Sequence, residues 1–168
     1  MDLRGETEFL LKKYGLKANK NLGQNFLINQ EVIDEIVSRS NITSEDLVIE
    51  IGPGLGSLTA KLAEAAKKVI AVELDDKMIQ VLEERFSLYQ NVELIHADIL
   101  KVNLNEMIEK EKYSSVKVVA NLPYYITTPI IMKLLEDNLP LDSITVMVQK
   151  EVGERLCAET SSKEYGAI

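Results

Sequence analysis

The amino-acid sequence predicts an α/β fold in which a mostly parallel sheet carries helices on both faces. Short apolar segments alternate along the chain with stretches of helical periodicity, which is typical of repeated strand–helix–strand units. The apolar segments are nearly continuous, as expected for strands that are buried on both faces of a parallel sheet. The first segment ends in a glycine turn, Gly52-Pro53-Gly54-Leu55-Gly56, where such sheets commonly bind a ligand.

These patterns predict the individual strands and helices. We expect strands at residues 47–51, 69–73, 92–96, 116–120 and 143–148. We expect helices at residues 30–39, 57–67, 76–86 and near 129–136. Ser57 and Asp76 stand at the starts of two of these helices, a position that Ser and Asp favour. In a parallel sheet the ligand lies beyond the carboxyl ends of the strands, so the residues that follow each strand are the candidate site residues.

The length and composition predict a single soluble domain. The chain has 168 residues, of which 46% are hydrophobic and 27% are charged. It has no apolar run of about 18 residues and no secretion signal, so we expect a cytoplasmic protein without a membrane contact. Its one cysteine, Cys157, cannot form an internal disulfide, and we expect it to be buried and inert on a helix after the fifth strand. We assign no metal site.

The charge is unevenly distributed along the chain. A net charge of −8 argues against a domain that binds RNA phosphates by itself. Residues 9–30, however, contain no Asp or Glu and carry Lys12, Lys13, Lys17 and Lys20, which leaves −12 for the rest of the chain. A short lysine-bearing segment is often simply solvated, so the charge alone decides little.

The glycine turn and an acid after the second strand together indicate a nucleoside site. The spacing is G-x-G-x-G rather than the G-x-G-x-x-G of dinucleotide-binding folds, and Pro53 lacks a backbone N–H that a pyrophosphate would use. Glu73 lies 21 residues after Gly52, where a carboxylate can accept hydrogen bonds from a ribose diol. The alternatives are an ordinary tight turn and a helix-capping carboxylate, although Asp75 and Asp76 are better placed to cap. The combination favours a nucleoside without pyrophosphate, of which S-adenosylmethionine is the commonest.

The third strand ends in His96-Ala97-Asp98. The Asp98 carboxylate can accept a hydrogen bond from the exocyclic amine of an adenine, and the alternative is a turn aspartate that caps the next segment. His96 is the only histidine, which suggests an acid–base role. Within a strand, however, a packed or solvent-facing histidine is the more common case.

The fourth strand ends in Asn121-Leu122-Pro123-Tyr124, which is the most informative stretch of the sequence. An exocyclic aromatic amine is a poor nucleophile because its lone pair is delocalised into the ring. The Asn121 side-chain oxygen and a backbone carbonyl at Leu122 or Pro123 can accept its two N–H groups, which favours a pyramidal nitrogen that attacks a methyl group. Tyr124 offers a ring on which a flipped-out base can stack. The alternative is a turn that ends the strand beside a core tyrosine.

A further motif precedes the first predicted helix. Gly23-Gln24-Asn25-Phe26-Leu27 lies inside the acid-free segment. Its Asn25 could bond the methionine end of a cofactor, with Phe26 and Leu27 as anchors.

Taken together, the motifs resemble the KsgA/RsmA family of ribosomal RNA adenine dimethyltransferases. The motifs that carry the resemblance are Gly23-Gln24-Asn25-Phe26-Leu27, Ile51-Gly52-Pro53-Gly54-Leu55-Gly56, Val72-Glu73-Leu74-Asp75, Ala97-Asp98 and Asn121-Leu122-Pro123-Tyr124-Tyr125-Ile126. Later blocks of that family are similar to Gln149-Lys150-Glu151-Val152 and Ser162-Lys163-Glu164-Tyr165-Gly166. The resemblance runs from about Lys20 to Ile168, with the motifs in family order and spacing.

The resemblance implies a Rossmann-like, class I S-adenosylmethionine-dependent methyltransferase. It implies N6,N6-dimethylation of two adjacent adenines near the 3′ end of small-subunit (16S) rRNA, on a 30S ribosomal precursor, by an enzyme that is monomeric at full length. The family's cofactor contacts fall on Asn25, Leu27, Gly52, Glu73, Asp98 and Asn121, to which we add Gly54 from the glycine turn. Its target-base residues fall on Asn121, Pro123 and Tyr124. We therefore divide the chain into a basic N-terminal segment, 1–29, with a cofactor-contacting motif, and a methyltransferase domain, 30–168.

Three other readings stay open from the sequence. The erythromycin-resistance methylases, which act on large-subunit (23S) rRNA, share the motifs, although Leu122 and the block at 163–166 are more similar to the small-subunit enzymes. A non-catalytic nucleoside-binding module is the second alternative. An NAD-dependent oxidoreductase is the third, and the glycine spacing and Pro53 argue against it.

One departure from the family concerns the end of the sequence at Ile168. The family continues with two more strands, a loop with Phe and Pro that closes over the target base, and a basic helical domain. We expect a truncated domain that binds cofactor weakly at most. Its fifth strand would be an exposed edge that favours self-association.

Overall fold

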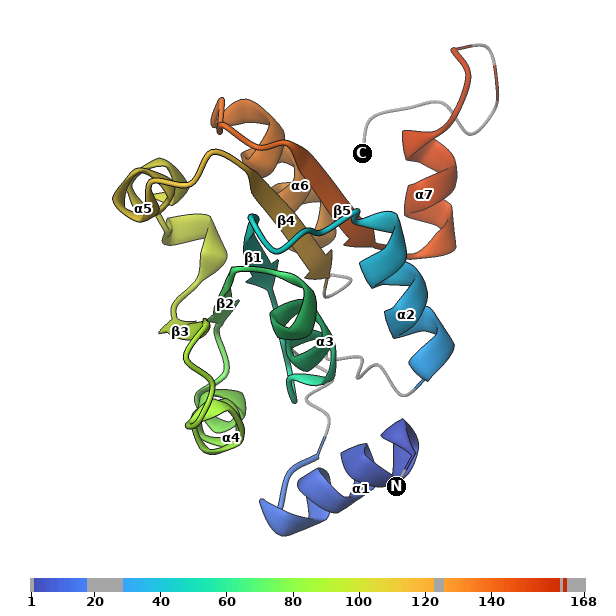
Figure 1. Cartoon of the computed structure of the whole chain (residues 1–168). Coiled ribbons are helices and arrows are strands. Elements are labelled where there is room, and N and C mark those ends of the chain that lie inside the picture. The colour runs from blue at the N-terminus through green and yellow to red at the C-terminus, as the bar shows by residue number, and fades with distance from the viewer. Residues whose placement is uncertain (1, 18–28, 123–125, 161, 163–168) are drawn as a thin grey trace.

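The computed structural model describes residues 2–17, 29–122, 126–160 and 162. Strands and helices alternate along most of it (Figure 1). In chain order the elements are α1 (Leu3–Lys13), α2 (Gln30–Arg39), β1 (Leu47–Ile51), α3 (Ser57–Ala65), β2 (Lys68–Glu73), α4 (Asp76–Phe86), β3 (Val92–His96), η2 (Ile99–Lys101), α5 (Leu104–Glu111), β4 (Val116–Asn121), α6 (Thr127–Glu136), β5 (Ser143–Met147) and α7 (Lys150–Leu156).

The strands form a parallel sheet in the order β3-β2-β1-β4-β5. All four neighbouring pairs among the described residues are parallel, so each connection must cross over a face of the sheet. The chain runs outward from β1 through β2 to β3, and then returns to the other side of β1 with β4. The order therefore reverses between β1 and β4, which makes the carboxyl end of β1 the switch point of the sheet.

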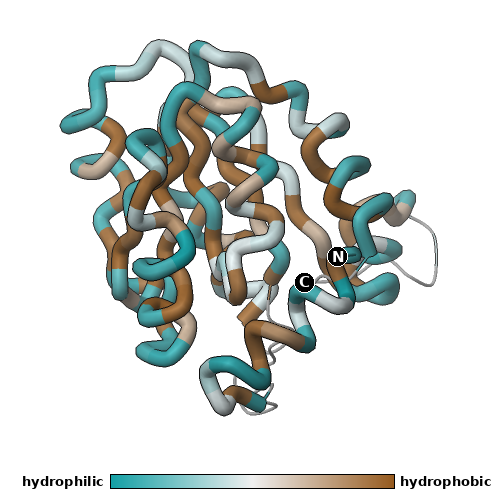
Figure 2. The backbone as a smooth tube through the Cα atoms, turned by 60° about the horizontal axis from the view of Figure 1, so that its bottom comes forward, coloured by the Kyte–Doolittle hydropathy of each residue, from teal (hydrophilic) through white to brown (hydrophobic). Residues whose placement is uncertain are grey.

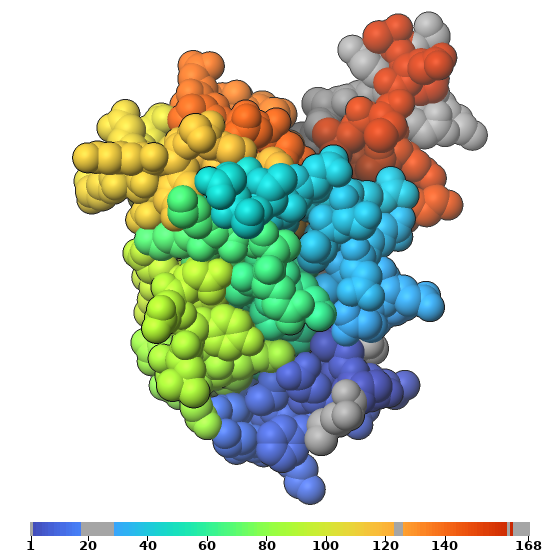
Figure 3. Space-filling view, viewed as in Figure 1, coloured from blue at the N-terminus to red at the C-terminus, as the bar shows by residue number. Residues whose placement is uncertain are grey.

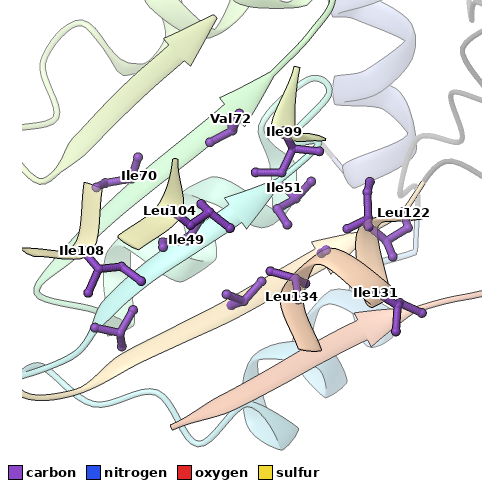
Figure 4. Close-up of a cluster of buried hydrophobic side chains, with 14 of the residues drawn as sticks. Ile49, Ile51, Ile70, Val72, Ile99, Leu104, Ile108, Leu122, Ile131 and Leu134 are labelled. Carbon is purple, nitrogen blue, oxygen red and sulfur yellow. The ribbon is translucent and has the colours of Figure 1, made fainter. Parts of the chain in front are cut away.

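Two apolar layers hold helices on opposite faces of the sheet. One layer joins alternate residues of β1, β2 and β4 to η2, α5 and α6, with Ile49, Leu104 and Leu134 among its buried members (Figure 4). On the other face Val48 and Val119 pack against α2 and α3, while α4 covers the β2 and β3 side. The apolar stretches of the backbone accordingly gather in the strands at the centre of the molecule (Figure 2). The predicted α/β fold with helices on both faces is confirmed.

The predicted element boundaries are confirmed to within one or two residues. The strands at 47–51 and 92–96 and the helices at 30–39 and 76–86 coincide with the observed elements. The second helix, predicted to reach residue 67, ends at Ala65 because Ala66 already has extended backbone angles. The last predicted helix begins at Thr127, before Pro129, because proline is tolerated in the first turn of a helix.

The sequence prediction missed α1, η2 and α5, and it placed Cys157 wrongly. The helix α5 is charge-rich, but Asn103 caps it by accepting a hydrogen bond from the Glu106 N–H at 3.2 Å, and Leu104 and Ile108 are buried. Cys157 is exposed rather than buried, because it lies at the end of α7, a helix without buried residues. Its expected inertness through burial is therefore wrong.

Candidate functional site

The glycine turn follows the central strand β1 and is built from left-handed backbone. Gly52, Gly54 and Gly56 have φ angles of +72°, +58° and +85°, which side chains with a Cβ rarely adopt. The Gly52 N–H donates to the Val72 carbonyl at 3.0 Å, which ties the turn to β2, and the Gly56 N–H donates to the Pro53 carbonyl at 3.0 Å. The turn is thus closed on itself and leads directly into α3.

The Glu73 carboxylate connects the end of β2 to this turn. Its Oε2 accepts a hydrogen bond from the Gly54 N–H at 3.1 Å, and its Oε1 accepts from the N–H groups of Leu74 and Asp75 at 2.9 and 3.0 Å. The residue is only 8% exposed. Burial raises the pKa of Glu73, while the backbone donors oppose that rise. An ionised carboxylate has about four acceptor positions, and the described backbone donors use three of them.

Asp75, rather than Glu73, caps the helix that follows. The Asp75 Oδ1 accepts hydrogen bonds from the N–H groups of Lys77 and Met78 at 2.8 and 3.4 Å. The sequence-based expectation that a neighbouring aspartate is the better cap is confirmed. The Glu73 carboxylate is therefore available to bond the glycine turn rather than to cap α4.

Asp98 and His96 follow the neighbouring strand β3. The Asp98 Oδ1 accepts from the Leu100 N–H at 3.0 Å and caps the short helix η2, which is the capping role considered for it from the sequence. His96 is exposed, and its Nε2 lies 2.9 Å from an Asp76 carboxylate oxygen and 3.2 Å from the Leu74 carbonyl. The sequence left a packed or a solvent-facing histidine as the more common cases, and the structure shows the solvent-facing one.

Asn121 ends β4 on the other side of β1. Within the sheet Ile51 pairs with Val72 on one side and with Ala120 on the other, and Glu73 pairs with His96. The carboxyl ends of β3, β2, β1 and β4 therefore lie at one rim of the sheet, at spacings of about 4.8 Å per strand. The structure brings Asp98, Glu73, the glycine turn and Asn121 to that rim, as the sequence predicted.

Four of the predicted site residues lie outside the described residues. They are Asn25, Leu27, Pro123 and Tyr124. Their roles stay predictions, as do the ligand roles of the described site residues.

Sequence reasoning missed one acidic residue beside the site. Glu50 precedes the glycine turn inside β1, is 1% exposed, and its Oε2 has no hydrogen-bond partner among the described residues. Burial raises the pKa of Glu50 to about 8, the Thr59 hydroxyl opposes this rise, and the charge of Glu73 adds to it. The only sequence signal was one carboxylate within an otherwise apolar strand.

The residues that the structure describes include neither a cluster of metal-ligating side chains nor a membrane-spanning helix. Within these residues, no group of three or more His, Cys, Asp or Glu side chains is arranged to hold a metal ion. No helix in the described part of the chain is long and apolar enough to cross a bilayer.

The sheet order, the glycine turn after β1 and the acid after β2 define a Rossmann-like methyltransferase fold. The chain belongs to the ribosomal RNA adenine dimethylase family, whose model matches residues 15–168. It is 52% identical, over 164 residues, to the ribosomal RNA small subunit methyltransferase A of Shouchella clausii, a match that covers 96% of this chain and 55% of that protein. The chain thus spans about half the length of the curated relatives it matches.

Two solved structures show the same relationship in three dimensions. A dimethyladenosine transferase from Plasmodium falciparum has a TM-score of 0.73 and 34% identity, over 84% of this chain and 49% of that one. The 23S rRNA methyltransferase ErmE has a TM-score of 0.69 and 29% identity, over 78% of this chain and 50% of that one. The implied membership of a ribosomal RNA adenine dimethyltransferase family is confirmed.

Proposed function

We propose that this chain forms the cofactor-binding and amine-positioning part of an enzyme that dimethylates N6 of adenines in small-subunit rRNA. The observation that carries the proposal is the hydrogen bond from Gly54 to Glu73 at the switch point of the sheet, one strand away from Asn121. It joins the two residues that we propose for nucleoside binding, and they lie at the same rim as the Asn121 amide. The family membership supplies the reaction class.

The strand-end residues fit S-adenosylmethionine as the cofactor. Glu73 would accept from the ribose through its remaining acceptor position, and Gly52 and Gly54, which have no Cβ, would let a ligand approach the backbone closely. Asp98 would accept from the adenine amine, while Asn25 and Leu27 would hold the methionine end. The bound cofactor supplies an electrophilic methyl group on a sulfonium. The Pro53 position agrees with a ligand that has no pyrophosphate.

The residues after β4 would activate the target amine. The Asn121 side-chain oxygen accepts one amine N–H, and a backbone carbonyl at Leu122 or Pro123 accepts the other, so the nitrogen lone pair is released from the ring. Tyr124 stacks on the flipped-out base, a contribution of about 1–3 kcal/mol. The amine proton is lost to solvent after nitrogen becomes cationic, so no strong general base is required.

The substrate that we propose is the 3′ region of 16S rRNA in a cytoplasmic 30S precursor. The relatives named small-subunit methyltransferases are about half identical to this chain, whereas ErmE, a 23S rRNA methyltransferase, is 29% identical. This difference favours the small subunit over the large one. The full-length enzyme is proposed to act as a monomer.

Methyl transfer from radiolabelled S-adenosylmethionine to a mixture of under-methylated small-subunit and large-subunit particles tests this function. We expect label in 16S rRNA with the full-length enzyme and its loss in Asn121→Ala. Because Asn121 is also a proposed cofactor contact, S-adenosylhomocysteine binding in calorimetry should weaken far less than methyl transfer does. The matched control is Asn105→Ala, which removes an exposed asparagine of α5. Label in 23S rRNA instead would select the large-subunit reading, and heat with NAD but not S-adenosylhomocysteine would overturn the proposal.

A further inference from the structure

The N-terminal helix α1 packs directly against α4 and against the glycine turn. Figure 3 shows the N-terminal segment against the surface of α4. Leu10, Leu11 and Tyr14 from the α1 region pack on a buried cluster that contains Leu55 of the turn together with Met78 of α4. The helix is thus connected to the candidate site through Leu55, although it lies far from the sheet in sequence. It also precedes residue 15, where the match to the family model begins.

Arg85 of α4 joins this helix to the turn with two short hydrogen bonds. Its Nη1 donates to the Leu55 backbone carbonyl at 2.6 Å, and its Nη2 donates to the Glu6 carboxylate of α1 at 2.6 Å. The Arg85 side chain is 18% exposed, so solvent screens these bonds less than it would on an open surface. A guanidinium suits this bridge because its donors point in fixed, divergent directions.

The bond to Leu55 fixes the plane of one particular peptide. The carbonyl of Leu55 and the N–H of Gly56 belong to the same planar unit and point in opposite directions. Arg85 holds the carbonyl end, and the Pro53 carbonyl accepts the N–H end at 3.0 Å. Because both ends are bonded, the plane cannot rotate without loss of both bonds. These two bonds fix the conformation of the turn that contains Gly54.

Helix α4 also packs closely against the Leu55–Gly56 peptide. A Cβ added at Gly56 would come within 2.5 Å of the Phe86 ring and 2.9 Å of Leu82. The turn therefore lies directly on the α4 surface that carries Arg85. A shift of Arg85 would be transmitted to the turn, since packed groups move together.

We propose that Arg85 is a positioning residue for the cofactor, and that α1 acts on the site through it. Glu6 orients the guanidinium, the guanidinium sets the peptide between Leu55 and Gly56, and that peptide sets the Gly54 N–H against Glu73. The ligand is the one assigned under the proposed function, on which this inference rests. The positioning itself is a property of the turn and can be measured without ligand.

The test compares two substitutions that each remove one cation from the contact of α1 with α4. Arg85→Met removes the bond to the turn, whereas Lys13→Met removes an ion pair with Glu84 that does not involve the turn. We expect Arg85→Met to weaken S-adenosylhomocysteine binding in calorimetry by about tenfold, and Lys13→Met to leave it within about twofold. Arg85→Lys, which retains a donor for the Leu55 carbonyl but lacks the divergent donors of a guanidinium, should bind more tightly than Arg85→Met and less tightly than the parent. If Arg85→Met lowers the melting temperature but leaves the affinity unchanged, Arg85 is only structural and the proposal is overturned.

A milder pair of variants tests the role of α1 even if Arg85→Met does not fold. Glu6→Ala frees the guanidinium but leaves α4 and the turn intact, and Glu8→Ala is the matched control because Glu8 pairs only with the exposed Arg4 among the described residues. We expect faster hydrogen exchange of the Gly56 amide in Glu6→Ala than in Glu8→Ala. Equal exchange would overturn the role of α1. If the full-length enzyme binds no S-adenosylhomocysteine, the proposed cofactor fails, and exchange at Gly56 still decides the positioning on its own.

Discussion

The Glu73 carboxylate accepts the Gly54 backbone N–H at 3.1 Å, and this bond joins the acid that ends β2 to the turn that ends β1. Three backbone donors in all converge on the carboxylate. The acid that the sequence indicated as a ribose acceptor therefore also organises the loop on which the ligand would lie. The Glu73 side chain reaches the turn because the two strands are neighbours in the sheet.

Glu73→Gln should weaken cofactor binding and lower stability together. A carboxamide has a single acceptor oxygen, so its NH₂ group must face at least one of the backbone donors. We expect a loss of about 1–3 kcal/mol in the free energy of unfolding and a larger dissociation constant for S-adenosylhomocysteine. Denaturant unfolding and calorimetry measure the two effects. Glu83→Gln, at an exposed position of α4, is the control and should change neither quantity.

Gly56→Ala should destabilise the fold more than Gly15→Ala. Both glycines have positive φ, at +85° and +60°, so both substitutions strain the backbone, at about 1–2 kcal/mol each. Only Gly56 also faces the Phe86 ring, whereas a Cβ at Gly15 meets nothing within 4 Å. We expect the Gly56 variant to lose about 1–3 kcal/mol beyond the Gly15 variant, from overpacking. Equal losses in chemical denaturation would show that α4 does not press on the turn.

Glu50→Gln should change how stability depends on pH. The pKa of Glu50 rises from 4.5 to about 8 on folding, so the folded state holds its proton in a range where the unfolded state releases it. Stability is then full below about pH 4.5 and falls as pH rises toward 8, by at most about 1.4 kcal/mol per pH unit. A glutamine does not ionise, so the variant should be more stable than the parent at pH 8 and similar to it near pH 5.

The measurement for Glu50 is the difference in unfolding free energy between variant and parent at several pH values. Glu109→Gln, on the exposed side of α5, is the control. The idea of a protonated buried carboxyl fails if the difference for Glu50→Gln does not grow with pH.

Lys117→Met should destabilise the fold by about 3–5 kcal/mol, the usual cost of breaking a buried ion pair. The Lys117 Nζ lies 2.8 Å from Asp46, and the two side chains are 13% and 3% exposed. Burial alone would raise the pKa of Asp46, but hydrogen bonds from Lys117 and Ser115 outweigh it and the pKa is lowered. The double variant Lys117→Met/Asp46→Asn should recover part of the loss in denaturant unfolding. No recovery would mean that the pair does not act as a unit.

This chain should self-associate through β5. The strand β5 is an edge of the described sheet, with β4 on one side only. An open strand edge offers unpaired backbone groups to another chain. We expect the sedimentation coefficient to rise with protein concentration. A monomer throughout a wide concentration range would contradict this expectation.

The sequence by itself determined the fold class, most element boundaries and the residues at the carboxyl ends of the strands. It could do so because both signals are local. An apolar run indicates a buried segment, and a glycine indicates backbone that other residues rarely adopt. Helix α5 was not predicted because its sequence is mostly polar and only a narrow face of it is apolar. Cys157 was predicted to be buried, but burial depends on which elements pack on α7, and α7 has no buried residues.

Only the tertiary structure decided how distant residues act together. The Gly54 N–H meets Glu73, Glu50 is enclosed beside Glu73, and Arg85 reaches from Glu6 to the turn. These relations depend on which strands are neighbours and where α1 packs. Local sequence patterns cannot predict such contacts. Glu6 and Arg85 are 79 positions apart, and they meet only because α1 packs on α4.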